Sequence, residues 1–240
     1  MSTQGREFIA VPIAVMTVSD SRTESDDKSG KLLVGRVQEA GHRFVEKVIV
    51  PDNIFEIRAV VSRWIAEPEV QVVLMTGGTG VTGFDGTPEA VRPLFEKELD
   101  GFGEIFRAIS FEEIGTSSLQ SRAVAGVANG TYLFSLPGSS GACATAWDKL
   151  LTHQLDYRTR PCNLVELMPR LLEHRQNKQR SSADIDRSLI VLSLRADTGS
   201  ISAAKQTFSH KGGACIAGSA FSPFHLRAGP FRPARRHLQP

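Results

Sequence analysis

The sequence predicts an α/β protein of three layers, in which a doubly wound, mostly parallel sheet carries helices on both faces. Two apolar runs, 11–18 and 70–75, are typical of buried strands, and 44–50 is predicted to be a further strand between them. Between them, apolar residues recur at helical spacing over 33–40 and 54–64. Strands that alternate with helices through short turns form parallel sheets with right-handed crossovers.

The turns between these segments contain residues that begin and end helices. Gly41 follows the first helical segment and is typical of a helix C-terminus. Asn53 precedes the second helical segment, where its side chain can cap the free backbone N–H groups. The second segment has one apolar face, formed by Ile54, Ile57, Val61 and Trp64. A helix in each connection supports the parallel arrangement.

The apolar pattern continues less regularly after the third strand. It predicts three helices and then a strand, over 87–99, 104–113, 117–126 and 131–136. Thr87 is expected to cap the first of these helices, and Pro88 suits its first turn. Charged residues of the two following helices, such as Arg122, are interpreted as a solvent-exposed face in preference to interface pairs.

A glycine-rich loop after the third strand is the main candidate binding site. Its residues are Thr76, Gly77, Gly78, Thr79 and Gly80. A glycine turn between a strand and a helix presents backbone N–H groups, which bind anions such as phosphate. Asp85 in the same loop can hold a metal ion on a bound phosphate. The alternative is a glycine-rich turn without a ligand.

Three other loops follow predicted strands and are expected at the same edge of the sheet. They contain Ser19 and Asp20, Pro51 and Asp52, and the turn of Pro137, Gly138 and Ser139. The ligand cleft of a parallel sheet lies at the carboxyl ends of its strands, so these loops should converge there. Such convergence favours a binding site more than any one loop does.

Several common motifs are excluded. The run 78–83 matches G-x-G-x-x-G, but it follows the third strand instead of the first, and no helix begins directly after it. No lysine occupies the position that a P-loop requires, so ordinary nucleotide hydrolysis is not indicated. The three cysteines are widely spaced and form no C-x-x-C pair, which leaves a disulfide framework or a zinc site without support.

The charge distribution divides the chain into two parts. Residues 1–174 carry a net charge of −6, whereas residues 175–240 carry +8. The first part is predicted to be the folded domain, and the second a basic, largely disordered extension. The extension lacks the pattern of a nucleic-acid-binding module, so a nucleic-acid partner is not expected. No apolar run is long enough for a membrane helix and the N-terminus is a poor signal peptide, so a cytoplasmic location is expected.

Several motifs, in order, resemble the MoaB/MogA family of molybdenum cofactor biosynthesis. The resemblance covers residues 8–174. Motifs shared with the family as a whole lie at 18–23, 50–52, 76–80, 85–89 and 136–139. Further stretches resemble the MoaB branch, at 111–116, 121–129 and 158–163.

The resemblance implies a molybdopterin-binding α/β fold that assembles as a trimer or a hexamer and works with other molybdenum cofactor biosynthesis proteins. In active members, Mg²⁺ and ATP adenylate the terminal phosphate of molybdopterin, and pyrophosphate is released. Carried over to this sequence, the glycine loop and the Gly138–Ser139 turn would bind molybdopterin and nucleotide. Asp85 would hold Mg²⁺, and Asp52 would orient the attacking phosphate or share the metal.

One position departs from the family pattern. Active members usually have arginine directly before the loop aspartate, where this chain has Phe84. Arg22 or Lys28 could replace the missing cation. Two hypotheses therefore stay open: an active molybdopterin adenylyltransferase, which the retained Asp85 favours, and a non-catalytic molybdopterin-binding or scaffold protein, which Phe84 favours.

Overall fold

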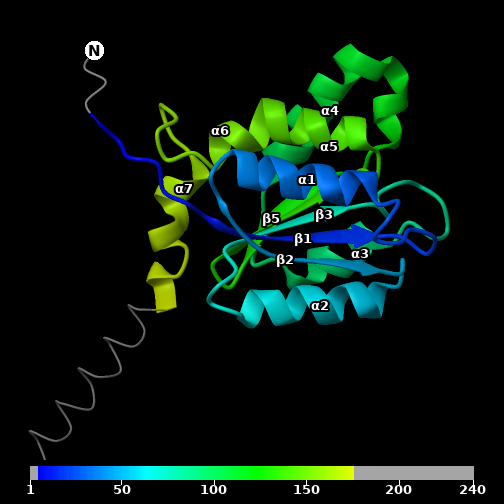
Figure 1. The fold of residues 1–240 in the computed structure, drawn as a ribbon, viewed down its shortest axis with the longest axis horizontal. Helices are drawn as coiled ribbons and strands as arrows, with labels where there is room; N and C mark the ends of the chain where they lie inside the picture. Colours follow the sequence, from blue (N-terminus) through cyan, green and yellow to red (C-terminus); the bar gives the residue numbers. More distant parts are fainter. Residues whose placement is uncertain (1–4, 176–240) are drawn as a thin grey trace, which may run out of the picture. The chain divides into compact units, whose positions relative to one another are not determined.

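A six-stranded sheet forms the centre of the molecule, with helices on both of its faces (Figure 1). The computed structural model describes residues 5–175. The predicted fold class is confirmed. The predicted C-terminal extension, 175–240, lies outside the described residues except for Arg175.

Four neighbouring strands are parallel, and the two remaining strands are joined to them and to each other by antiparallel pairing. The strand order is β2-β1-β3-β6-β5-β4, and β2, β1, β3 and β6 run in the same direction. The strands are β1 (Pro12–Val18), β2 (Arg43–Val50), β3 (Val72–Thr76), β4 (Lys97–Glu98), β5 (Val124–Ala128) and β6 (Thr131–Leu136). In the register of the parallel strands, Val18 pairs with Val50 and Thr76 pairs with Leu136. Their carboxyl ends therefore lie at one edge.

Side chains that alternate along the strands form a separate core on each face of the sheet. Ile13 and Val15 belong to a cluster with residues of α1 (Lys28–Glu39), α4 (Asp100–Ile114) and α5 (Ser140–Ala146). Ala14 and Met16 belong to a second cluster with residues of α2 (Ile54–Ala66) and α3 (Thr87–Val91). Burial on both faces explains why β1 and β3 are continuous apolar runs.

The chain after α5 is helical in short pieces. A π-helical turn, Trp147–Leu151, leads into α6 (Thr152–Gln154), and α7 (Leu164–Leu167) lies near the end of the described chain. In Figure 1 the N-terminal segment passes next to α7, where the Arg6 guanidinium pairs with Glu166 at 2.8 Å. Within residues 5–175, every helix is too short or too polar to cross a membrane.

The predicted caps are partly confirmed. The Asn53 side chain accepts hydrogen bonds from the first turn of α2, as expected, and Gly41 follows α1 with a φ of +83°. Thr87 is not a cap, because Gly86 occupies that position. The Thr87 hydroxyl is buried instead and donates to the carbonyl oxygen of Gly77 at 2.9 Å. This contact ties the first residue of α3 to the glycine loop.

One predicted helix is wrong, and another was predicted too long. The segment 117–126 contains the end of a 3-10 helix and the beginning of β5, which joins β6 through the turn Asn129–Gly130. The helix predicted over 87–99 ends at Val91 and continues only as a 3-10 turn, because Pro93 cannot donate to an α-helical hydrogen bond. The residues that follow form β4.

Candidate functional site

The loops that follow β1, β2, β3 and β6 meet at the carboxyl edge of the sheet. The Asp52 N–H donates to Oδ1 of Asp20 at 3.0 Å, which joins the loops after β1 and β2. The Gly77 N–H donates to the Leu136 oxygen at 3.0 Å. A Cβ atom on Gly138 would lie 3.2 Å from the Cα atom of Gly77, so the two glycine turns touch. The structure thus brings together all four loops named from the sequence.

The conformation of the loop after β3 requires glycine at two positions. Gly77 and Gly78 have φ angles of +104° and +63°. A Cβ atom at Gly77 would lie 2.2 Å from the Val18 oxygen, and one at Gly78 would lie 2.3 Å from Oγ1 of Thr87 and 2.6 Å from Oδ2 of Asp52. Only glycine tolerates both the left-handed backbone and this close approach. The loop is therefore packed directly against the Asp52 carboxylate.

Asp52 lies among other acidic groups. Its Oδ1 accepts a hydrogen bond from the Gly86 N–H at 3.0 Å. Burial raises the pKa of Asp52, and the nearby charges of Asp85, Asp20 and Glu89 act in the same direction. Negative charges gathered at one place favour the binding of a cation.

Asp85 is held by its own loop. Its Oδ2 accepts from the backbone N–H and the hydroxyl of Thr82, at 2.8 and 2.6 Å. These hydrogen bonds lower the pKa of Asp85, and the charge of Arg122 adds to the effect. Its carboxylate also lies next to Gly80, where a Cβ atom would be 2.6 Å from Oδ2. Asp85 is therefore an ionised group beside the glycine loop.

The donor set fits Mg²⁺ held together with a substrate. Among residues 5–175, no group of three His, Cys, Asp or Glu side chains is placed to hold a metal ion. Mg²⁺ is commonly bound by one or two carboxylates, with substrate phosphates and water completing its shell. Asp52 and Asp85 match this requirement.

A cavity of about 420 Å³ opens beside the glycine loop. Eight of the predicted residues line it, namely Gly77, Gly78, Thr79, Gly80, Asp85, Pro137, Gly138 and Ser139. The other predicted residues, Ser19, Asp20, Asp52 and Thr76, do not. The Thr76 hydroxyl is buried and donates to the Pro137 oxygen at 3.0 Å, so it joins the two loops instead of facing the cavity.

Residues that sequence reasoning missed also line this cavity. They come from α4 and the 3-10 helix Gly115–Gln120 that follows it, and include Phe106, Ser110, Ser117 and Gln120. No motif marks them, because they reach the cavity only through the packing of α4 next to α5.

The Cys143 thiol lies against the Thr76 hydroxyl. Burial raises the pKa of this thiol to about 11, so the cysteine is protonated at neutral pH.

Arg122 is the most important residue that was missed. Its Nε–H donates to the backbone oxygen of Gly80 and its Nη2–H to the backbone oxygen of Asp85, both at 2.6 Å. Its Nη1 pairs with the Glu89 carboxylate. Its backbone N–H donates to the Thr79 oxygen at 3.1 Å. The prediction that Arg122 belongs to a solvent-exposed face is therefore wrong.

The loop after β1 is fixed by a buried ion pair. Asp27 is 1% exposed and accepts from Oγ1 of Thr17 and Nζ of Lys47, both at 2.8 Å. Lys47 also pairs with Glu24 at 2.6 Å. Burial alone would raise the pKa of Asp27, but the hydrogen bonds that it accepts outweigh burial and lower it. Arg22, suggested as a replacement cation, donates to a carbonyl oxygen within its own loop.

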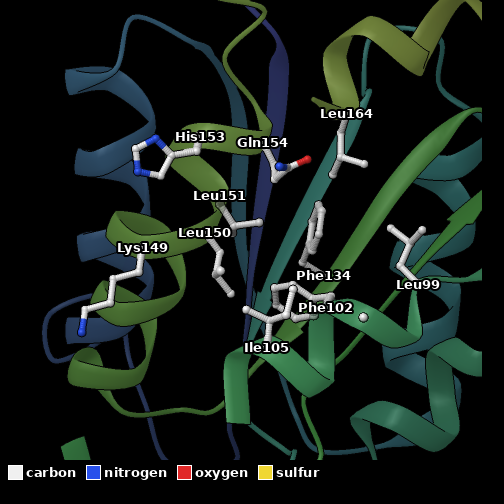
Figure 2. A pocket seen from close by; sticks show the side chains of 11 residues that line it. Leu99, Phe102, Ile105, Phe134, Lys149, Leu150, Leu151, His153, Gln154 and Leu164 are labelled. Atoms are coloured by element: carbon white, nitrogen blue, oxygen red, sulfur yellow. The ribbon is translucent and has the colours of Figure 1, made fainter. Parts of the chain in front are cut away.

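A second cavity of about 390 Å³ has a different character. It lies between α4 and the helical turns at 147–154, and Figure 2 shows it surrounded mainly by apolar side chains. Lys149 and His153 lie at its margin, with their polar ends directed away from the apolar group (Figure 2). It contains none of the predicted site residues, so the cavity at the glycine loop is the candidate site.

Comparison with known proteins identifies the family of the chain. Residues 14–157 match the family model described as a probable molybdopterin binding domain. Molybdenum cofactor biosynthesis protein B of Escherichia coli strain K12 is 60% identical over 163 residues, which cover 68% of this chain and 96% of that protein. The chain belongs to the MoaB/MogA family of molybdenum cofactor biosynthesis proteins. The matched region includes all twelve predicted site residues.

Solved structures of the MoaB/MogA family share the fold. A crystal structure of molybdenum cofactor biosynthesis protein B has 44% identity and a TM-score of 0.61, covering 62% of this chain and 94% of that chain. The tungsten cofactor synthesizing protein MoaB from Pyrococcus furiosus has 38% identity and a TM-score of 0.55, covering 60% and 92%. The family domain in this chain is thus a molybdopterin-binding α/β domain.

Proposed function

We propose that the protein is a molybdopterin adenylyltransferase that binds molybdopterin and Mg–ATP at the glycine-loop cavity. The observation that carries the proposal is the placement of Asp52 and Asp85 against the same glycine loop, at Gly78 and Gly80. Two carboxylates beside an anion-binding loop match the needs of a nucleotide bound with a divalent metal. Membership of a molybdenum cofactor biosynthesis family supports molybdopterin as the acceptor.

The proposed reaction joins two phosphates. An oxygen of the terminal phosphate of molybdopterin attacks the α-phosphorus of ATP, and the bond from that phosphorus to the bridging oxygen breaks, which releases pyrophosphate. The loop amides would hold the phosphate oxygens, and Asp52 would orient the attacking phosphate. Asp52 and Asp85 would hold Mg²⁺, which supplies positive charge that offsets the charge of the phosphates. Phosphoryl-type transfer depends mainly on such positioning and charge neutralisation.

A non-catalytic molybdopterin-binding or scaffold protein is the second candidate. Phe84 favours it, because this side chain is 77% exposed and provides no charge at the position before Asp85. A protein of this kind would bind molybdopterin in the same cavity without transferring an adenylyl group.

Incubation of purified protein with molybdopterin and Mg–ATP, followed by mass measurement of adenylated molybdopterin, distinguishes the two candidates. Product in catalytic excess over protein supports the transferase. In that case Asp85→Ala should abolish transfer and leave assembly unchanged, whereas the control Glu104→Gln, at an exposed position of α4, should keep full activity. If the protein binds molybdopterin but forms no product, the adenylyltransferase proposal is contradicted and the non-catalytic molybdopterin-binding or scaffold protein is supported.

We also propose that the chain forms a homo-oligomer, a trimer or a hexamer, and works with other molybdenum cofactor biosynthesis proteins. Three apolar side chains of α4 support self-association, because Ile105, Phe111 and Ile114 are each more than half exposed. Light scattering of the purified full chain would give the oligomeric mass, and a monomer at micromolar concentration would contradict this proposal.

A further inference from the structure

We infer that Arg122 is a positioning residue for nucleotide binding. Its guanidinium group donates hydrogen bonds to both ends of the loop from Gly80 to Asp85, an arrangement that we call the clasp, and so fixes the Asp85 carboxylate. This inference rests on the proposed function, since it assigns Asp85 to the nucleotide. It concerns a residue of the chain that precedes β5, far from the glycine loop in sequence.

The guanidinium group joins two carbonyl oxygens that lie five positions apart in the loop. The Nε–H and Nη2–H groups point in the same direction, and they donate to the oxygens of Gly80 and Asp85 at 2.6 Å each. Hydrogen bonds with a charged donor are short and about twice as strong as neutral ones. With the backbone N–H of Arg122 on the Thr79 oxygen, three loop carbonyls are attached to one residue.

The third side-chain contact connects this clasp to the helix after the loop. Nη1 of Arg122 pairs with Glu89 in the first turn of α3. The backbone oxygen of Glu89 in turn accepts from the Arg58 guanidinium of α2 at 2.8 Å. The clasp therefore links the loop to elements that pack in the core.

Apart from the Arg122 contacts, further attachments lie just after the loop, where the Gly86 N–H donates to Asp52 and the Thr87 hydroxyl donates to Gly77. Residues 81–84 of the loop are exposed, and Val81 and Phe84 expose 67% and 77% of their surface. The contact between Asp85 and Thr82 lies within the loop itself and cannot attach it to the domain. Segments with few buried contacts open locally at low free-energy cost. Loss of the clasp should therefore release the loop and move Asp85, while the core stays folded.

Arg122 also supplies the positive charge that Phe84 does not. Its side chain is 30% exposed, so the guanidinium reaches solvent beside Asp85. Its Nη2–H donates to the Asp85 backbone oxygen, so a positive charge lies beside the loop aspartate. A lysine at position 122 would keep the charge but could not span both carbonyl oxygens, because its ammonium group is a single point of donation.

The test uses the full chain and three variants: Arg122→Gln, Arg122→Lys and the control Arg107→Gln. Arg107 is matched to Arg122, because it donates to a backbone oxygen of the same segment, that of Ala123, without touching the loop. Amide hydrogen exchange of peptides covering 78–87 measures loop order, and calorimetry with ATP and MgCl₂ measures nucleotide affinity. Neither readout requires turnover.

Both Arg122 variants should increase the amide exchange rate of residues 78–87 about tenfold and weaken Mg–ATP binding about tenfold. Changes of this size are expected for the loss of one or two hydrogen bonds. Exchange elsewhere, and all properties of the Arg107 variant, should stay at wild-type values. Unchanged loop exchange in Arg122→Gln would overturn the inference, and so would faster exchange with unchanged affinity. Full rescue by Arg122→Lys would overturn the two-carbonyl clasp.

The outcome for Arg122 can be separated from that for the proposed reaction. If the wild type binds Mg–ATP but makes no adenylated molybdopterin, the transferase proposal fails, while the exchange and affinity data still decide the role of Arg122. If the wild type transfers adenylyl groups and the Arg122 variants match it in exchange and affinity, the inference about Arg122 fails alone.

Discussion

Replacement of Gly78 by alanine tests whether the glycine loop is held in the conformation described above. Gly78 has a φ of +63°, and an added Cβ atom would lie 2.3 Å from Oγ1 of Thr87 and 2.6 Å from Oδ2 of Asp52. Both distances are much shorter than an ordinary van der Waals contact, so one or both side chains must move. Thr87 is buried and has little space in which to do so.

The size of the effect follows from two contributions. A left-handed backbone costs an L-residue such as alanine about 1–2 kcal/mol. Displacement of Thr87 breaks its hydrogen bond with the Gly77 oxygen, with a net loss of about 0.5–1.5 kcal/mol. We therefore expect Gly78→Ala to lower the free energy of unfolding by about 1.5–3.5 kcal/mol. With a urea m-value of about 2 kcal/mol/M, the unfolding midpoint falls by about 0.8–1.8 M.

Urea unfolding, followed by far-UV circular dichroism, measures this shift. Gly35→Ala is the matched control, because Gly35 lies inside α1 and no atom lies within 4 Å of its added Cβ. That variant should be more stable than the wild type, by about 0.5–1 kcal/mol, because alanine is the better helix former. A midpoint of Gly78→Ala at or above that of the wild type, with an unchanged m-value, would show that the reasoning about the loop is wrong.

Other predictions concern the buried ion pair and a helix cap. Lys47→Met should lower the free energy of unfolding by about 3–5 kcal/mol in urea at pH 7, because the Asp27 charge stays buried without its partner. The lowered pKa of Asp27 stabilises the fold above about pH 4, and this contribution disappears as the pH falls through the folded-state pKa. A wild-type stability that stays flat in this acid range would contradict the assignment. Asn53→Ala should cost about 0.5–2 kcal/mol in thermal unfolding and Asn53→Asp much less, and equal losses would exclude a capping role.

The first half of the fold could be predicted from the sequence, because its signals are local. The apolar runs of β1 and β3 and the periodic face of α2 each lie within a single short segment. The second half was harder to predict, since the pattern of 117–126 is compatible with a helix. The dipeptide Asn129–Gly130 was the missed signal, because Asn-Gly between apolar runs is typical of a two-residue hairpin. Its φ angles, +49° and +84°, are those of such a turn.

The loops of the candidate site could be predicted from the sequence, but the side chains that hold these loops in place could not. Glycine turns and loop carboxylates follow strand ends, so their convergence could be deduced from topology alone. Arg122 contacts Gly80 and Asp85, which precede it by 42 and 37 residues, and no local pattern indicates which surface arginine folds back in this way. The Lys47–Asp27 pair could not be predicted for the same reason. Tertiary packing decides which charged residues meet in a buried pair.

The two outer strands of the sheet have a consequence for how copies of the chain can meet. One edge is β4, which has only the two exposed, charged residues Lys97 and Glu98. The other edge is β2, where Arg43, Glu46 and Lys47 are charged. Short strands and charged side chains disfavour pairing with a further strand. Extension of the sheet from one molecule into the next is therefore disfavoured. This protects the folded protein from strand-mediated aggregation at high concentration. Any assembly of copies should then use the helical faces.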